Sequence, residues 1–328
     1  MQRDSYFDNF KSFLILLVVI GHFVGAFIYK NHFMNFMVMT IYTVHMPAFA
    51  FVSAYFSKRN ALLKLIKTLL IPYFIFQTIY FIFLYTTGRD NTFELLQPYF
   101  TLWFMLSLFC WRLVIGKLIK IKGILYISYL VAILAGYVTV IGAFGAIERT
   151  ITYLPFFLLG YTFDKEKFIQ FADKKLVRAG ALAVLLAILV IMYLSCENIN
   201  FDILIMKYSY QKSDIVKFGW LYRTAIYIFS TVFIYVIAAI MPRKKYWFTY
   251  MGQRTMSIYL LHGLIYKILQ YQTNLYDTID TTAEMLMILL LAIFITFILS
   301  LKPFDFVVRK LSSVPLEKML SWNLNIFT

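Results

Sequence analysis

The chain has little charge. Only 14% of its 328 residues are charged and 62% are hydrophobic, whereas a soluble domain is about a quarter charged. The mean hydropathy is +0.76. Only helices and closed barrels satisfy the backbone in lipid, and the apolar runs here are continuous, which disfavours the alternating pattern of a barrel. We therefore expect an all-α polytopic membrane protein.

Cysteine, glycine and proline are also scarce. Two cysteines, Cys110 and Cys196, exclude a disulfide framework. With no Gly/Ser/Pro-rich linker and no low-complexity tract, we expect one integral membrane domain over residues 1–328. The absence of an internal repeat counts against the inverted-repeat transporters. The first apolar run has no small-residue cleavage site after it, so we interpret it as a retained helix.

Acidic residues are few as well: 16 Asp and Glu stand against 31 Lys and Arg, for a net charge of +15. In a soluble protein this excess would indicate nucleic acid, but here the basic residues indicate topology, and no nucleic-acid partner is expected. With the N-terminus inside, only about a quarter of the Lys and Arg residues fall outside, which predicts that both termini are cytoplasmic. The ten predicted spans are 11–29, 35–56, 67–86, 98–116, 123–141, 149–163, 179–196, 220–241, 249–270 and 282–301.

The sequence places three of its four histidines inside predicted spans. His22 follows Lys11 by eleven residues, which on a helix is about 1,100° of rotation and roughly 16 Å. The two side chains therefore share a face. An ionisable group inside a span is a functional-site hypothesis by default. His45 and His262 lie at similar depth, whereas His32 falls in an outer loop and is expected to do little.

A neutral imidazole inside the membrane can take a proton from an alcohol and return it to a leaving group. Two other interpretations compete with this one. Each histidine could simply form a hydrogen bond between helices. A metal site is disfavoured, because the histidines are not spaced as ligand pairs and no carboxylate lies beside them; we expect no metal.

Three polar segments accompany the histidines. Lys58 and Arg59 follow the second predicted span and either bind phosphates or anchor the helix at the inner surface. Trp103 lies in the fourth span, where its indole N–H needs a partner. Glu148 and Arg149 open the sixth span, where the arginine either snorkels to the surface or holds a sugar or carboxylate.

Several short pieces of the chain, in order from the first span to the ninth, resemble the membrane-bound acyltransferase 3 family of bacterial polysaccharide O-acetyltransferases. One difference is Ala54, where the family pattern usually carries glycine, which permits closer backbone approach. The matching pieces are Tyr6-Phe7-Asp8-Asn9-Phe10-Lys11, Gly21-His22, His45-Met46-Pro47, Ser53-Ala54-Tyr55-Phe56-Ser57-Lys58-Arg59, Trp103-Phe104, Leu154-Pro155-Phe156-Phe157-Leu158-Leu159-Gly160-Tyr161 and Ser257-Ile258-Tyr259-Leu260-Leu261-His262.

The resemblance implies an O-acyltransferase in the bacterial cytoplasmic membrane. Its donor would be cytoplasmic acetyl-CoA, and its acceptor a hydroxyl of a cell-surface or capsular polysaccharide or its lipid-linked precursor. The resemblance gives His22 the role of base or acyl carrier, with Trp103 as an oxyanion donor. The other residues expected at the site are His45 beside His22, Lys11, Lys58 and Arg59 on the phosphates of acetyl-CoA, and Glu148, Arg149, Tyr42 and His262 near the acceptor.

Several questions stay open on the sequence alone. His45, Tyr42 and His262 are each candidates for the group that orients His22. A carrier or flippase of lipid-linked saccharide, or a structural component of a polysaccharide synthase, would also have basic inner loops and a few buried polar groups. The sequence does not decide between a homodimer and association with polysaccharide-assembly machinery, and it names neither the acceptor sugar nor the acyl group.

Overall fold

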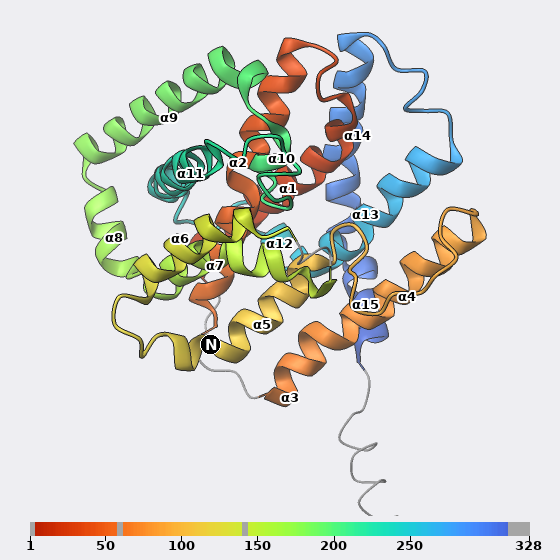
Figure 1. Cartoon of the computed structure of the whole chain (residues 1–328), viewed down its shortest axis with the longest axis horizontal. Helices are drawn as coiled ribbons and strands as arrows, with labels where there is room; N and C mark the ends of the chain where they lie inside the picture. Colours follow the sequence, from red (N-terminus) through yellow and green to blue (C-terminus); the bar gives the residue numbers. More distant parts are fainter. Residues whose placement is uncertain (1–3, 58–61, 140–143, 314–328) are drawn as a thin grey trace, which may run out of the picture.

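The computed structural model describes residues 4–57, 62–139 and 144–313, and this part of the chain is helical with no strand (Figure 1). The α-helices are α1 (Ser5–Val24), α2 (His32–Tyr55), α3 (Leu62–Leu65), α4 (Ile71–Thr86), α5 (Trp103–Leu118), α6 (Ile124–Leu134), α7 (Ile147–Tyr161), α8 (Lys165–Ala172), α9 (Lys175–Ser195), α10 (Phe201–Leu204), α11 (Gly219–Ile240), α12 (Thr249–Gly252), α13 (Thr255–Gln272), α14 (Thr282–Leu299) and α15 (Lys302–Ser312). Short helical turns are η1 (Gly25–Phe27), η2 (Ile66–Leu70), η3 (Ala135–Tyr137), η4 (Phe144–Ala146) and η5 (Cys196–Asn198).

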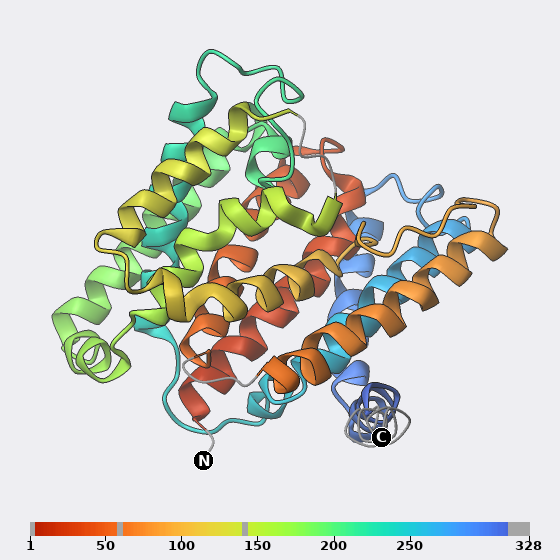
Figure 2. The same cartoon turned by 60° about the horizontal axis from the view of Figure 1, so that its bottom comes forward.

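Helices α1 and α2 form the centre of the bundle. A side chain caps the start of each helix. The Asp4 carboxylate accepts a hydrogen bond from the backbone N–H of Tyr6 at 3.1 Å, and the Asn31 side-chain oxygen accepts one from the backbone N–H of Met34 at 2.9 Å. Figure 2 shows α1 rising from the N-terminus through the middle of the molecule. We call the end of the bundle where α1 begins the N-face and the opposite end the far face.

Only some of the predicted spans are long and apolar enough to cross a membrane. In the described residues six helical segments meet that condition. Helices α5, α6 and α7 have 16, 11 and 15 residues, and sixteen residues reach only about 24 Å of the roughly 30 Å of hydrocarbon. Thus ten spanning helices remain a prediction. The six segments are Ser5–Phe27, His32–Tyr55, Leu62–Thr86, Lys175–Asn198, Gly219–Ile240 and Thr282–Leu299.

A proline inside α2 leaves one backbone carbonyl free to accept a hydrogen bond from a neighbouring helix. Pro47 has no N–H, so the carbonyl four residues earlier, on Thr43, has no partner within the helix. Ser230 of α11 donates its hydroxyl to that carbonyl at 2.7 Å. Eight residues further along α2, a Cβ on Gly160 of α7 would overlap the backbone carbonyl of Phe51. These two contacts fix α2 between α11 and α7.

The polar residues at the start of α1 attach a loop of the N-face. Asn9 donates its side-chain amide to the carbonyls of Pro242 and Lys244, at 3.0 and 2.8 Å. Ser12 accepts the amide of Gly252 at 2.7 Å. Both side chains are buried. The polar character of this segment is therefore explained by hydrogen bonds that join α1 to the connection between α11 and α13.

Candidate active site

Five of the side chains that the sequence singles out meet at one cavity of about 320 Å³, which we call the histidine cavity. They come from four helices: α1, α2, α5 and α7. Their convergence, from segments as much as 127 positions apart, is what the sequence pattern alone did not specify. The five side chains are His22, Tyr42, His45, Trp103 and Arg149.

The cavity lies nearer the far face than the sequence indicated. We expected His22 near the middle of a span that begins at Lys11. Instead α1 begins at Ser5, and His22 lies two residues before its last residue, Val24. The axial distance from Ser5 to His22 is therefore about 26 Å. The predicted start at Lys11 was too late because the polar first turns of α1 are buried and helical.

The three histidines of α1, α2 and α13 have different surroundings. His45 donates Nδ1–H to the carbonyl of Ile41 at 2.7 Å, and His262 donates Nδ1–H to Ile258 at 2.9 Å. Because a carbonyl only accepts, each neutral ring then has Nε2 free as an acceptor. His22 is only partly buried and faces the cavity, with no hydrogen-bond partner among the described residues.

His262 is the histidine closest to His22. The two ring centroids are 5.3 Å apart, and Nε2 of His262 is buried without a hydrogen-bond partner. Tyr42 lies farther from His22, at 6.3 Å between ring centroids, and stands between His22 and His45. Of the three candidates for orienting His22, His262 has the ring closest to that of His22, and its Nε2 atom is free to accept a hydrogen bond.

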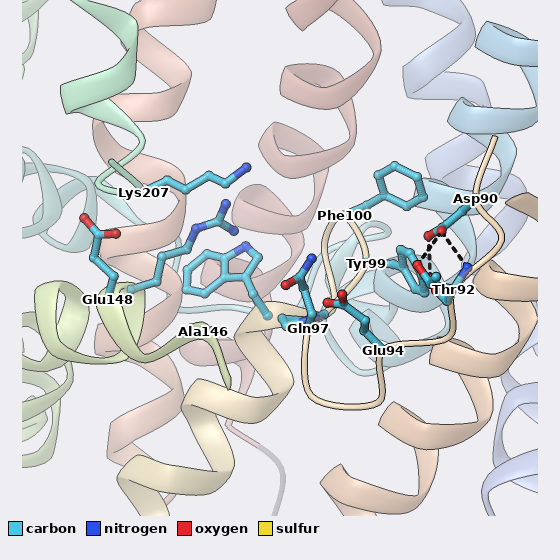
Figure 3. Close-up of a pocket in the computed structure, with 12 residues that line it drawn as sticks. Asp90, Thr92, Glu94, Gln97, Tyr99, Phe100, Ala146, Glu148 and Lys207 are labelled. Carbon is cyan, nitrogen blue, oxygen red and sulfur yellow. Dashed lines mark hydrogen bonds between the residues drawn. The ribbon is translucent and has the colours of Figure 1, made fainter. Parts of the chain in front are cut away.

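A second cavity of about 370 Å³ continues the histidine cavity, and we call it the acidic cleft. The two cavities share the side chains of Phe100, Trp103, Arg149 and Lys207. The remaining lining of the acidic cleft is polar and comes largely from the loop that joins α4 to α5 (Figure 3). Its main polar members are Asp90, Glu94, Gln97, Tyr99 and Glu148.

A buried glutamine of α4 holds that loop in place. Gln77 donates its side-chain amide to the carbonyls of Glu94 and Gln97, at 2.8 and 2.7 Å, and accepts the amide of Tyr99 at 3.0 Å. The Tyr99 hydroxyl in turn donates to Asp90 at 2.7 Å. This hydrogen bond keeps the pKa of the Asp90 carboxyl below its usual value.

Glu148 and Arg149 both line the acidic cleft but form no ion pair with each other in the described residues. Arg149 lies over the ring of Trp103, with its guanidinium carbon 4.7 Å from the ring centroid. Glu148 lines only the acidic cleft, and one of its carboxylate oxygens is buried without a hydrogen-bond partner. Arg149 therefore reaches both far-face cavities, whereas Glu148 reaches only the acidic cleft.

A third cavity, of about 360 Å³, lies toward the N-face and is called the lysine cavity. Lys11 lines it and forms an ion pair with Asp8 at 2.8 Å. Arg112 of α5 lines it as well and donates Nε–H to the Ser57 hydroxyl at 2.9 Å. Lys58 and Arg59, which we expected to hold the donor, follow Ser57 but lie outside the described residues.

One methionine stands between the two halves of the site. Met46 of α2 lines both the lysine cavity and the histidine cavity. Beside it, the hydroxyl of Tyr259 donates to the carbonyl of Thr101. On α1, the side chains that line the two cavities are Lys11, Ile15, Val18 and His22, whose spacing of three and four residues places them on one helix face.

The sequence also matches the profile of an acyltransferase domain, of the acyltransferase 3 type, over residues 4–301. The chain belongs to the acyltransferase 3 family. The matched region contains all three cavities and the six long apolar segments. No curated protein and no solved structure matches the chain significantly.

In this acyltransferase, sequence reasoning missed several cavity residues. Arg112, Lys207 and Lys267 were counted only as topology charges, yet each lines a cavity. For Arg112 there was a signal, because Phe104, Leu108 and Arg112 follow a spacing of four residues and all line the lysine cavity. Lys207 lies in a loop, where no helical spacing applies.

Proposed function

We propose that the protein transfers an acetyl group from acetyl-CoA to a hydroxyl of a cell-surface saccharide or its lipid-linked precursor. A single observation carries the proposal. Two cavities approach each other from opposite ends of the bundle and meet at Met46, one lined by Lys11 and Arg112 and the other by His22. Such a pair suits a charged donor and a hydroxyl acceptor that arrive from opposite faces.

The lysine cavity is the proposed donor site, with the N-face toward the cytoplasm. Acetyl-CoA is anionic at its nucleotide end, and Lys11 and Arg112 supply positive charge at the cavity. Lys58 and Arg59 are proposed to add to it. The narrow pantetheine arm would then extend past Met46 and carry the thioester to His22, roughly 16 Å along α1 from Lys11.

In the proposed reaction His22 acts as general base. It takes the proton of the acceptor hydroxyl while that oxygen attacks the thioester carbonyl carbon. The carbon–sulfur bond then breaks, and the proton returns from His22 to the departing thiolate, so an ester and free CoA are formed. Nε2 of His262 is proposed to accept the other N–H of His22, which would fix the tautomer that exposes a basic nitrogen to the acceptor.

The oxyanion of the tetrahedral intermediate needs a donor in the histidine cavity. Trp103 lines this cavity, and its indole N–H has no hydrogen-bond partner among the described residues. An unengaged N–H held by packing is the kind of preorganised group that stabilises developing charge. We therefore assign Trp103 this role, with the Arg149 guanidinium against its ring.

The deciding experiment follows free thiol released from acetyl-CoA by purified protein in detergent. His22→Ala should lower the turnover by about 10²–10⁴-fold. The matched control is His32→Ala, because His32 pairs with Glu197 on the surface and lines none of these cavities. This control should retain the wild-type rate. Activity of His22→Ala within about tenfold of wild type would overturn the role of base.

A different result would change the class of function. If the wild-type protein neither releases thiol nor binds acetyl-CoA, the donor assignment fails. A carrier of lipid-linked saccharide would then be the better description, and transport into vesicles should be measured in its place. That activity would not depend on a proton acceptor at His22.

A further inference from the structure

The histidine cavity is lined by cationic side chains and by no described carboxylate. Three cations line it: Arg149 from α7, Lys207 from the segment after α10, and Lys267 from α13. No carboxylate is among its described lining residues. In contrast, the acidic cleft contains Asp90, Glu94 and Glu148. Arg149 and Lys207 line both cavities and Lys267 lines only the histidine cavity, so the described carboxylates are confined to the acidic cleft.

The three cations are held by neutral groups. Lys267 donates to the side-chain oxygen of Gln270 at 2.7 Å and to the hydroxyl of Tyr271 at 3.2 Å. Lys207 lies over Tyr208, at 4.8 Å from the ring centroid. Arg149 lies over Trp103 as described above. None of the three forms an ion pair with a described carboxylate, whereas Lys11, Lys165 and Arg243 all do.

Partly buried cations of like charge at one small cavity oppose each other unless an anion joins them. Carboxylates of the acidic cleft lie near Arg149 and Lys207, but no described carboxylate lines the histidine cavity. An anionic group of the bound molecule would therefore complete this cavity. The phosphates of acetyl-CoA do not fit by position, because the proposed donor site lies beyond Met46 toward the N-face. The acceptor, which approaches from the far face and places a hydroxyl at His22, is in the right position.

We propose that the acceptor is an acidic saccharide, whose carboxylate or phosphate binds Arg149, Lys207 and Lys267 while a neighbouring hydroxyl faces His22. Its neutral hydroxyls would extend into the acidic cleft, where carboxylate and amide oxygens accept hydrogen bonds. The inference rests on the proposed function, because it takes the histidine cavity as the acceptor site. It goes further by naming the charge of the acceptor.

The test uses matched pairs of sugars that differ in charge. D-glucuronate is compared with its methyl ester, and glucose 6-phosphate with glucose, by binding to the protein in detergent and as acceptors of acetyl groups. Each anionic sugar should bind at least about tenfold more tightly than its neutral partner, because charge-assisted hydrogen bonds are roughly twice as strong as neutral ones. Whichever anionic sugar gives the larger preference identifies a carboxylate or a phosphate as the recognised group.

Substitutions then locate the preference. Lys267→Gln and Lys207→Gln should each reduce the preference for the anionic sugar, with little change in the binding of the neutral one. Lys217→Gln is the matched control, because Lys217 is exposed in the same outer segment and lines neither far-face cavity. It should keep the wild-type preference.

Three outcomes would overturn the inference. They are equal binding of the acid and its ester, no binding of any of the four sugars, and a Lys267→Gln protein that loses affinity for acetyl-CoA while keeping the preference for acid. The binding assay contains no acetyl-CoA, so the two proposals fail separately. A preference for the anionic sugar without thiol release would support the anion site and refute the transferase. His22-dependent thiol release without such a preference would support the transferase and refute the anion site.

Discussion

The two ends of α1 use polar residues in opposite ways. At the N-face, Asp8, Asn9 and Ser12 are buried, and each is bonded to another part of the chain or to α1 itself. Near the far face, His22 meets a cavity and has no hydrogen-bond partner among the described residues. One helix thus carries a polar segment that builds the fold and a polar side chain that is left available.

The difference shows how to separate structural from functional polarity inside a membrane. A buried polar group without a partner is costly, so groups whose only role is structural are satisfied by the protein. The Nε2 atom of His262 and a carboxylate oxygen of Glu148 break that rule. Both belong to residues beside or on the far-face cavities. Other buried atoms without a partner lie away from these cavities, among them Nε of Arg243 and Oγ of Ser312, so an unsatisfied group indicates a site only where it lies at a cavity.

Among the changes that test this comparison, we expect the largest effect from a substitution of Asn9, and we expect it on stability. Asn9→Leu removes the bonds to the carbonyls of Pro242 and Lys244 and the one from the Thr249 hydroxyl. Leaving these buried groups without partners should lower the free energy of unfolding by about 3 kcal/mol or more. Thermal unfolding in detergent measures it, and Asn274→Leu, at an exposed position, is the control.

The folded fraction of the Asn9→Leu protein should still release thiol from acetyl-CoA at the wild-type turnover. A lower turnover at unchanged stability would contradict the division of α1 into a structural and a functional end.

A smaller effect, on catalysis alone, is expected at His262. His262→Ala removes the unpaired Nε2 beside His22 and should lower kcat by about 10–100-fold, or roughly 1.4–2.7 kcal/mol of activation energy. The KM for acetyl-CoA should not change, because His262 lies beside His22 and does not line the lysine cavity, which is the proposed donor site. Steady-state kinetics measures both.

His262→Gln, which keeps an acceptor but cannot titrate, should recover part of the rate if His262 only orients His22. If neither variant changes kcat, the orienting group is another residue, with Tyr42 the next nearest.

The smallest effect should come from Lys11. Lys11→Gln removes positive charge from the lysine cavity and should raise the KM for acetyl-CoA by a few-fold, about 1 kcal/mol, since the lysine is partly exposed and screened. Lys64→Gln is the control, because Lys64 is exposed and lies outside that cavity. Equal effects of the two changes, or a smaller difference at low salt than at high salt, would place the donor elsewhere.

Much of the fold followed from the sequence. The continuous apolar runs predicted a helical membrane protein, and the described residues are helical, with six segments able to span. The resemblance to the acyltransferase 3 family is confirmed. The number of spans was less certain, because hydropathy does not separate a helix buried among other helices from one that crosses the lipid, as α7 illustrates.

The site was predictable only in part. The shared face of Lys11 and His22 follows from helical geometry, and both side chains do line cavities. In contrast, the proximity of His22 to His262 depends on which helices pack together over 240 positions of sequence. Lys207 and Lys267 looked like ordinary topology charges because a charge count does not reveal whether a carboxylate lies nearby.

The Met46 partition also has an electrical consequence. In the proposed orientation, cavities from the two sides of an energised membrane come within one side chain of each other, and histidines that can exchange protons line one of them. A continuous column of water through that point would let protons flow down the membrane potential and dissipate it. A thioether has no proton to pass on and bends to fill irregular space. Met46 would thus block the passage of protons between the two cavities and still move aside for the pantetheine arm, so that the membrane potential is kept.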